Sequence, residues 1–384
     1  MIFTEAEMRR RLSAFRKAME NLDVDAAFVH TADNVFYLSG VPLLSEWGRP
    51  LWLVVGHHNL HVICARIETE NARSFGYQAD VHPYDDDHPA IEQATRLVAR
   101  LLQRTGAGRG VTGIERQRLP LGIFERLSAS LPGARFTDAG DALDKLRIVK
   151  SVEELDLLQV AAEISKTGAR AFLDAVSDGA TELAVAAHAT AAMDTALADS
   201  YPAGASSSYA YCQAGEHTLT PHMHPTGRRI ARGDVLALNV FPVVWGYCIE
   251  LERTFVFGEP TTGQHQALSA VNQAFEAAKA AVAPGAPMSD IDALSAQILR
   301  QHGFGEFIRH GTGHAHGIMI GAAGREELGE LRTYNPTALQ PGMATSVEPG
   351  IYLPDLGGFR HSDVLFVTHG GSVTVTDFPC DIEL

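Results

Sequence analysis

The sequence of 384 residues has few cysteines and no long apolar segment. The four cysteines are widely separated and form no C-x-x-C pair, a pattern typical of free thiols in a reducing compartment. They are Cys64, Cys212, Cys248 and Cys380. The N-terminal 19 residues lack the apolar core and cleavage site of a signal peptide, and no run of about 18 apolar residues predicts a membrane span. We therefore expect a cytoplasmic protein without a membrane partner.

Basic residues are also scarce relative to acidic ones. Lys and Arg total 31 against 46 Asp and Glu, which gives a formal net charge of −15. An acidic surface argues against nucleic acid or an anionic membrane as a partner. The hydrophobic fraction of 46% is typical of a globular protein, and the length favours two domains over one.

The first part of the chain alternates helical and strand patterns. Amphipathic helices are predicted over residues 4–22 and 89–106, the second closed by Gly106. Short apolar runs predict strands, and they cover residues 25–31, 34–40, 50–56, 60–66, 110–116 and 135–140. This alternation predicts an α/β domain over residues 1–148.

The second part begins with a helix-start signal. Ser151 and Glu154 have the spacing of a capping box, which predicts a long helix from this point. Further helices, a hairpin over residues 237–255, a helix pair over 266–285 and 288–304 and a terminal group of strands follow. We expect an α+β domain over residues 149–384.

Polar residues of catalytic type gather in four segments of this second part. Each segment alone is also typical of a solvated loop or the wet face of a sheet. The segments are "PHMH" with His222, the hairpin with Asn239, Glu250 and Glu252, the loop "RHGTGHAHG" with His310, His314 and His316, followed by Arg325, and the terminal strands with Glu348, Arg360 and Ser362.

The order of these motifs resembles the pita-bread hydrolases, the family of methionine aminopeptidase, prolidase, aminopeptidase P and creatinase. The resemblance spans nearly the whole chain, because "LRIVKSVEELDLL" is similar to the family's interdomain junction. It implies an α/β N-terminal domain followed by an α+β pita-bread catalytic domain.

The resemblance also implies where metal ions would bind. In the metallopeptidase members, two Asp, one His and two Glu bind two divalent ions; the matching positions here are Asn239, Glu250, His314, Glu348 and Ser362. Asn239 is neutral and Ser362 is a poor ligand, so two ions would face only two carboxylates. We predict no paired-metal centre and no cofactor, with one ion on Glu250, His314 and Glu348 as the alternative.

The local motifs are more similar to creatinase, the member that works without metal. "LNVFPVVWGYCIELERTF", "GHAHGIMIGAAGREE" and "EWGRP" carry this similarity. It implies that His222 is the catalytic acid/base, that His314 is a further active-site histidine, and that Glu252 and Glu348 hold a guanidinium. It also implies that Arg49 and Arg325 bind the carboxylate of the substrate and that the Trp47 ring lines the pocket. The remaining pocket residues expected to contact substrate are Phe241, Cys248, Glu250 and Ser362.

The chemistry of these groups agrees with that assignment. Carboxylates bind a planar guanidinium through charge-assisted hydrogen bonds, arginines bind a carboxylate, and a histidine can carry a proton from water to a leaving nitrogen. We therefore predict a metal-independent hydrolase that cleaves a C–N bond in a small, zwitterionic guanidino or amidino carboxylic acid. We expect a homodimer in which Trp47 and Arg49 complete the partner's site.

Three departures from creatinase leave the substrate open. Cys248 stands where a tyrosine is expected, Ser362 replaces a histidine, and Glu250 occupies a position that is neutral in creatinase. Neighbouring carboxylates disfavour a thiolate, so we expect Cys248 to be no nucleophile. The alternatives are a metal-dependent aminopeptidase or Xaa-Pro dipeptidase with a depleted site, and a non-catalytic binding domain.

Overall fold

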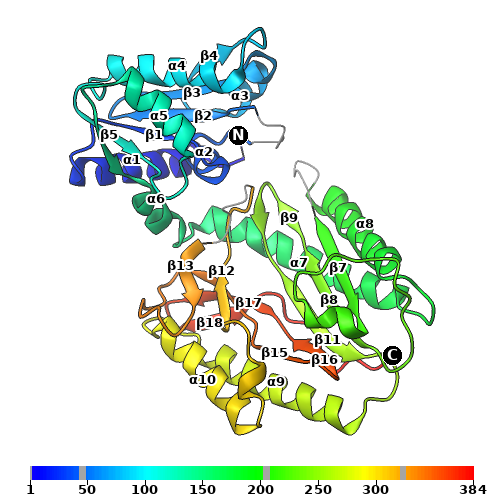
Figure 1. Ribbon diagram of the computed structural model, residues 1–384. Helices are drawn as coiled ribbons and strands as arrows, with labels where there is room; N and C mark the ends of the chain where they lie inside the picture. Colours follow the sequence, from blue (N-terminus) through cyan, green and yellow to red (C-terminus); the bar gives the residue numbers. More distant parts are fainter. Residues whose placement is uncertain (1, 43–48, 202–207, 321–325) are drawn as a thin grey trace. The chain divides into compact units, whose positions relative to one another are not determined.

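The computed structural model describes residues 2–42, 49–201, 208–320 and 326–384. Trp47 and Arg325, two of the predicted site residues, lie outside these ranges. The chain forms two compact units (Figure 1). One is Met1–Arg147 with a segment that begins at Ile318, and the other is Ile148–Gly317 with the C-terminal part of the chain.

The first unit is a mixed six-stranded sheet with helices. The strand order is β4-β3-β2-β1-β5-β6, with parallel pairs β3/β4, β1/β5 and β5/β6 and antiparallel pairs β1/β2 and β2/β3. The strands are β1 (Ala26–Val29), β2 (Trp52–Gly56), β3 (Leu60–Ala65), β4 (Asp80–Tyr84), β5 (Val111–Ile114) and β6 (Arg135–Asp138). The α-helices are α1 (Glu5–Asn21), α2 (Ala32–Ser39), α3 (Thr69–Phe75), α4 (Ala90–Arg104), α5 (Leu121–Ser130) and α6 (Gly140–Arg147).

One predicted strand of this unit is a helix. Residues 34–40 form most of α2, which ends at Gly40 in the left-handed conformation with φ 74°. Val35, Phe36, Tyr37 and Leu38 are all fully buried, as are the polar residues of this helix, so it has no solvent-exposed face to reveal its period. A short, mainly apolar run does not distinguish a buried helix from a strand, which explains the wrong prediction.

A segment from late in the chain completes the first unit. The backbone N–H of Ile320 donates to Oδ1 of Asp33 at 2.7 Å, and the carbonyl of Ile318 accepts from Arg147 Nη2 at 3.1 Å. Arg147 Nη1 also donates to Oδ1 of Asn34 at 3.0 Å. All three polar side chains are buried, so residues 318–320 are part of this unit's polar interior.

The second unit holds helices against several antiparallel sheets. Helices α7 (Val152–Ala175) and α8 (Glu182–Ser200) pack on the three-stranded sheet β11-β8-β7 (Figure 1). Helix α9 (Thr262–Ala281) contacts β14, β15 (Gly350–Leu353) and β16 (Gly357–Arg360), and α10 (Met288–Gln301) contacts β13. The first sheet contains β7 (Tyr209–Ala214), β8 (Val235–Phe241) and β11 (Leu251–Val256). The second has the order β13-β12-β14-β17-β18, with β12 (Gly313–Ala315), β13 (Glu326–Leu331), β14 (Ala344–Val347), β17 (Asp363–Thr368) and β18 (Gly371–Thr374).

The predicted capping box at the start of α7 is present. The side chain of Ser151 accepts from the Glu154 N–H, and the Glu154 carboxylate accepts from the Ser151 N–H at 2.9 Å. Glu154 also accepts a hydrogen bond of 2.8 Å from the Tyr247 hydroxyl. This hydrogen bond connects the start of α7 to the hairpin that contains Glu250 and Glu252.

That hairpin is more broken than the two strands predicted from sequence. Between β8 and β11, a small ribbon of β9 (Val243–Val244) and β10 (Tyr247–Cys248) closes through Trp245 and Gly246, whose φ angles are 49° and 79°. Positive φ at both central residues is typical of a type I′ turn. Glu250 lies in the break between β10 and β11, and Glu252 pairs with Asn239 across the sheet.

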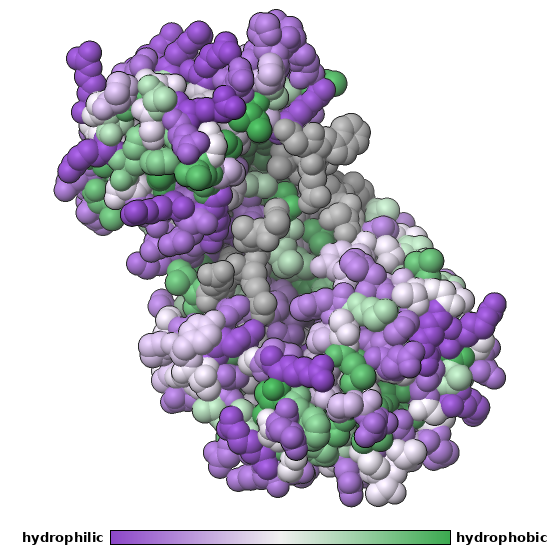
Figure 2. Space-filling model, in the orientation of Figure 1, coloured by the Kyte–Doolittle hydropathy of each residue, from purple (hydrophilic) through white to green (hydrophobic). Residues whose placement is uncertain are grey.

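The molecular face in Figure 2 is mainly hydrophilic, with hydrophobic residues in small groups. No helix within the described ranges combines the length and the apolar character that crossing a membrane requires.

Candidate active site

Three buried carboxylates lie at the centre of the candidate site. Glu250, Glu252 and Glu348 are 5%, 3% and 8% exposed. They come from the break before β11, from β11, and from the segment after β14. Burying a carboxylate is costly unless charged or hydrogen-bonding groups surround it, so the partners of each define the site.

Glu252 has a guanidinium partner from its own chain. Arg360, at the end of β16 (Gly357–Arg360), binds Glu252 in a bidentate manner, with Nε on Oε2 and Nη2 2.6 Å from Oε1. Burial raises the pKa of Glu252 to about 7; Arg360 opposes this shift, while Glu250 and Glu348 add to it. Burial alone would lower the Arg360 pKa, but Glu252 holds it well above its usual value, so the guanidinium stays charged.

A hydrogen-bond chain extends from Arg360 to a partly buried histidine. Arg360 Nη1 donates to the Tyr352 hydroxyl at 3.1 Å, which lies 2.7 Å from Nε2 of His310. His310 Nδ1 is 2.8 Å from the Gly311 carbonyl oxygen, which can only accept. Nδ1 therefore carries the proton and Tyr352 donates to Nε2. Burial lowers the pKa of His310, in agreement with this neutral form.

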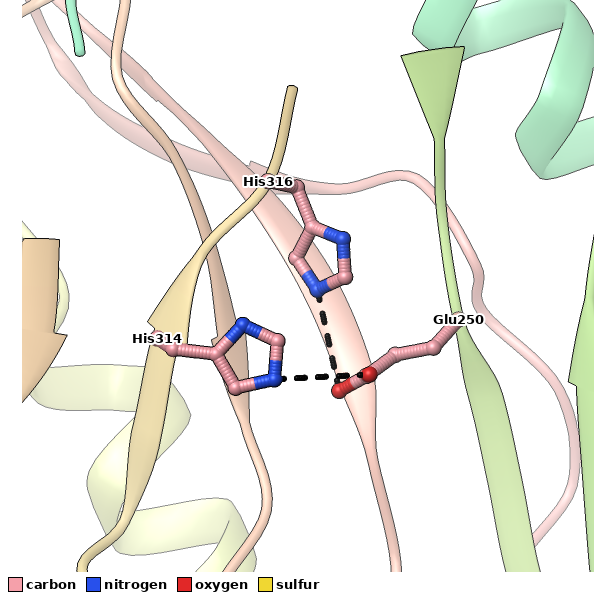
Figure 3. A group of neighbouring side chains, drawn as sticks. All are labelled: Glu250, His314 and His316. Carbon is pink, nitrogen blue, oxygen red and sulfur yellow. Dashed lines mark ion pairs between the residues drawn. The ribbon is translucent and has the colours of Figure 1, made fainter. Parts of the chain in front are cut away.

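Glu250 is held from one side by Ser362. The Ser362 hydroxyl donates to Glu250 Oε1 at 2.8 Å, and the two backbone hydrogen bonds between Ser362 and Glu252 join β11 to the terminal strands. Nε2 of His314 is 3.5 Å from Glu250 Oε2, and Nε2 of His316 is 3.6 Å from Glu250 Oε1 (Figure 3). Burial would raise the Glu250 pKa, but the two histidines lower it well below its usual value.

His314 lies on strand β12, and its side chain faces the carboxylates of Glu250 and Glu348. Its Nε2 is also 3.6 Å from Glu348 Oε1, and its Nδ1 is 3.1 Å from the Ala315 carbonyl oxygen. Burial alone would lower the pKa of His314, but Glu250 and then Glu348 raise it to about 9. The predicted residues Glu250, His314 and Glu348 therefore do meet in one place.

His316 joins this group although sequence reasoning gave it no role. It is 1% exposed, its Nδ1 is 3.2 Å from the Cys248 carbonyl oxygen, and its Nε2 has no hydrogen-bond partner within the described part of the chain. The only sequence signal was its place two residues after His314 in "GHAHG".

Cys248 lies close to the Glu250 carboxylate, and Phe241 ends strand β8 beyond Asn239. Cys248 is 1% exposed, and burial followed by the Glu250 charge raises the pKa of its thiol well above the usual range, so it is no thiolate. Phe241 is half-buried and stacks on Tyr209, with ring centroids 4.7 Å apart. Its ring also lies edge-on to Tyr211, so Phe241 belongs to an aromatic cluster beside Asn239.

His222 lies in an exposed loop anchored close to this site. The Gln213 side-chain amide donates to the carbonyl oxygens of Thr220 and Pro221, at 3.1 and 2.9 Å. Pro221 lines one small cavity together with Asn239 and Arg360. The backbone next to His222 is thereby tied to the Arg360 side of the site.

Arg49 belongs to the first unit, and its contact with Asp86 lies within that unit. Its guanidinium forms an ion pair of 2.8 Å with Asp86. Its predicted contact with a partner subunit's substrate stays a prediction.

The residues present do not fit a pair of divalent ions. Oδ1 of Asn239 accepts from Arg360 Nη2 at 3.2 Å, and the Ser362 hydroxyl gives its proton to Glu250, so neither position supplies an anionic ligand. Among the residues that the structure describes, the group that offers ligand atoms within 4.8 Å of one another is Glu250, His314 and His316. That set can hold at most one ion, because it contains a single carboxylate.

Comparison with known proteins settles the family. Residues 156–369 match metallopeptidase family M24, and residues 11–149 match the creatinase/prolidase N-terminal domain. The chain belongs to metallopeptidase family M24. The predicted family and two-domain pita-bread architecture are confirmed.

Individual relatives of this M24 protein include both creatinase and dipeptidases. Creatinase of Bacillus sp. (strain B-0618) is 31% identical over 383 residues, covering 98% of this chain and 92% of the relative. The putative dipeptidase YkvY of Bacillus subtilis (strain 168) is 29% identical over 357 residues, covering 93% and 94%. The crystal structure of dipeptidase PepE from Mycobacterium ulcerans has a TM-score of 0.83 and 27% identity, covering 99% and 98%. The relatives are thus hydrolases of more than one substrate class.

Proposed function

We propose that the protein is a metal-independent hydrolase that cleaves a C–N bond in a small guanidino or amidino carboxylic acid. The main support is that Asn239 and Ser362 are neutral. They occupy two positions where the metallopeptidase members have metal ligands. The similarity to creatinase supports it. A soluble cytoplasmic homodimer is part of the proposal.

The charge of the site supports a cationic substrate group. Three carboxyl groups, Glu250, Glu252 and Glu348, are buried around two cationic groups, Arg360 and His314, whose pKa is about 9. Burial raises the pKa of Glu252 to about 7, and a guanidinium or amidinium bound beside it would favour its ionised form. Arg360 uses one acceptor site on each Glu252 oxygen, and a carboxylate oxygen offers two, so Glu252 retains room for a substrate N–H.

In the proposed reaction, His222 takes a proton from water as the oxygen attacks the guanidino or amidino carbon. The C–N bond breaks, and His222 returns the proton to the leaving nitrogen. Glu252 and Glu348 hold the cationic end, while Arg325 and the partner subunit's Arg49 hold the carboxylate. Fixing both ends orients the carbon toward the water.

The test is a substrate screen with chelator-treated protein. Guanidino, amidino and ureido acids are offered, and urea or ammonia release is measured. We expect turnover of at least one compound, lost in His222→Ala and retained in His224→Ala, a control two residues along the same exposed loop. Failure of the whole panel, or activity that depends on a metal ion, would count against the proposal.

A dipeptidase is the second candidate. The proximity of Glu250, His314 and His316 favours it, because two histidines and a carboxylate can hold one catalytic ion. The similarity to YkvY and PepE supports it too. Hydrolysis of Xaa-Pro and other dipeptides by metal-loaded protein, abolished by chelator, would replace the first candidate with this one.

A further inference from the structure

Glu182, the first residue of α8, is a buried carboxylate that the proposed reaction does not use. It is 0% exposed and lies where α8 packs on β7 (Figure 1). Its two oxygens face donor groups of three residues, Ala214, His217 and Thr226. Burying a carboxylate is costly unless hydrogen-bond donors surround it, so these three residues account for its place in the interior.

The two carboxylate oxygens bind opposite ends of the loop that contains His222. Oε1 accepts from the Ala214 N–H at 2.8 Å, and Ala214 precedes His222. Oε2 accepts from the N–H and the hydroxyl of Thr226 at 3.0 and 2.7 Å, and Thr226 follows His222. Nδ1 of His217 lies 2.9 and 3.0 Å from the two oxygens and adds a second contact before His222. One side chain therefore joins the two ends of residues 214–226.

The outgoing end of this loop is also bound to the backbone of α8. The Glu182 N–H donates to the Arg228 carbonyl oxygen at 3.1 Å, and the Leu183 N–H donates to the Thr226 carbonyl oxygen at 3.0 Å. These bonds fix the outgoing end to the helix. The Glu182 carboxylate extends the same anchorage to the incoming end.

Gln213 fixes the middle of the same loop. Its side chain is buried, and its amide donates at 2.9–3.1 Å to three carbonyl oxygens, those of Thr220, Pro221 and Met223. These residues lie on both sides of His222. With the ends held by Glu182 and the middle held by Gln213, the backbone at His222 is restrained although its side chain is exposed.

We propose that Glu182 is a positioning residue for His222, an inference that rests on the proposed role of His222 as acid/base. An acid/base group must lie within hydrogen-bond reach of the proton that it moves, and a misplacement of about 1 Å can lower a rate roughly 100-fold. The carboxylates expected to hold the substrate, Glu252 and Glu348, come from other elements. Loosening the loop should therefore slow the reaction more than it weakens substrate binding.

The first test replaces Glu182 with glutamine. The variant keeps the size of the side chain but turns one acceptor oxygen into an NH₂ group, which faces donors of the loop and releases one of its ends. We expect Glu182→Gln to lower kcat at least ~10-fold and to change KM less than about twofold, measured with a compound that the substrate screen identifies. Glu163→Gln, at an exposed glutamate of α7, is the matched control and should leave both constants unchanged.

A double-mutant cycle shows whether Glu182 acts through His222. Added to His222→Ala, Glu182→Gln should not lower the residual turnover further, because the group that it positions is already absent. Equal fold losses in the two backgrounds would overturn the inference. A rise in KM with unchanged kcat would overturn it as well.

Hydrogen exchange, followed by mass spectrometry, supplies a measurement that needs no substrate. Amides of residues 214–226 should exchange at least about tenfold faster in Glu182→Gln than in the original protein, whereas those of α7 should not change. Thr226→Val removes the hydroxyl donor alone and should act in the same direction, which keeps the test valid if Glu182→Gln does not fold. Unchanged exchange in both variants would overturn the inference. Faster exchange together with a failed substrate screen would count against the proposed function and leave the anchoring of the loop in place.

Discussion

At the residue scale, Arg360 controls the charge of the candidate site. It is buried, and its guanidinium contacts Glu252, Asn239 and Tyr352 at once. A charged residue enclosed in this way stabilises its carboxylate partner while the pair is intact, and removing one member leaves the other charge without compensation.

Replacing Arg360 should therefore destabilise the second unit strongly. We expect Arg360→Met to lower the free energy of unfolding by about 3–5 kcal/mol, measured by urea denaturation. The double variant Arg360→Met/Glu252→Gln removes both charges and should regain part of that loss. Equal stability of the single and double variants would show that the two charges are not coupled.

The sequence identified some of these residues and left others without a role. Glu250, His314 and Glu348 could be predicted because each lies inside a short motif with fixed spacing. The bond between Arg360 and Glu252 joins positions 108 residues apart and depends on how β16 crosses β11, which no local pattern reveals. The importance of His316 depends on burial and on an unsatisfied atom, which are properties of the packed structure.

At the element scale, close backbone contact fixes the loop that carries His222. The turn η2 (Gly215–Leu219), just before that loop, packs on β16, where the N–H of Gly358 donates to Thr218 Oγ1 at 2.8 Å. A Cβ atom at position 358 would lie 2.0 Å from the Thr218 carbonyl oxygen. Only glycine lets the two segments approach this closely.

Gly358→Ala should consequently push η2 away from β16. We expect a loss of about 1–3 kcal/mol in unfolding free energy, as for other overpacked sites, together with reduced turnover because the His222 loop moves. Melting temperature and substrate turnover report the two effects. Gly370→Ala is the control, since a Cβ there meets no atom of the described residues within 4 Å; similar behaviour of both variants would contradict this explanation.

Most elements followed from periodicity and capping, as the capping box at Ser151 and the helix α4 illustrate. The errors arose where local patterns are ambiguous. Helix α2 is buried on all sides, and the hairpin breaks at Glu250, whose carboxylate accepts a hydrogen bond from Ser362, 112 residues later in the chain.

At the scale of the whole molecule, acid stability should depend on a carboxylate in the first unit. Glu115 is 1% exposed and accepts hydrogen bonds from the Thr31 N–H at 3.0 Å and from Asn34 Nδ2 at 2.6 Å. Burial alone would raise its pKa, but hydrogen bonds and charge from His30, with the hydroxyl of Thr31, lower the pKa from 4.5 to about 2.

A carboxyl whose pKa is lower in the folded state stabilises the protein above its unfolded pKa. That contribution should disappear as pH falls from about 4.5 to about 2, and the difference corresponds to about 3 kcal/mol. Urea denaturation at several pH values measures it. Glu115→Gln should be less stable at pH 6 and lose less stability on acidification; an unchanged pH dependence would contradict the assignment.

The predicted homodimer has its own test at this scale. If Arg49 completes the partner's site, mixing and re-equilibrating the inactive variants Arg49→Ala and His222→Ala gives half heterodimers, each with one intact site. About a quarter of the original activity should return, measured as product release, with size-exclusion chromatography confirming the dimer. Inactive mixtures that do exchange subunits would show that each subunit uses its own Arg49.

The late segment of the first unit affects how that unit is made on the ribosome. Asp33 and Arg147 are synthesised early, whereas Ile318 and Ile320, which they bind, emerge about 170 residues after Arg147. At roughly 5–20 residues per second, the first unit waits on the order of 10–30 s for its last interior segment. During that interval Arg147 and Asp33 lack these two partners, so the nascent first unit should be most vulnerable to proteases and most dependent on chaperones before translation passes residue 320.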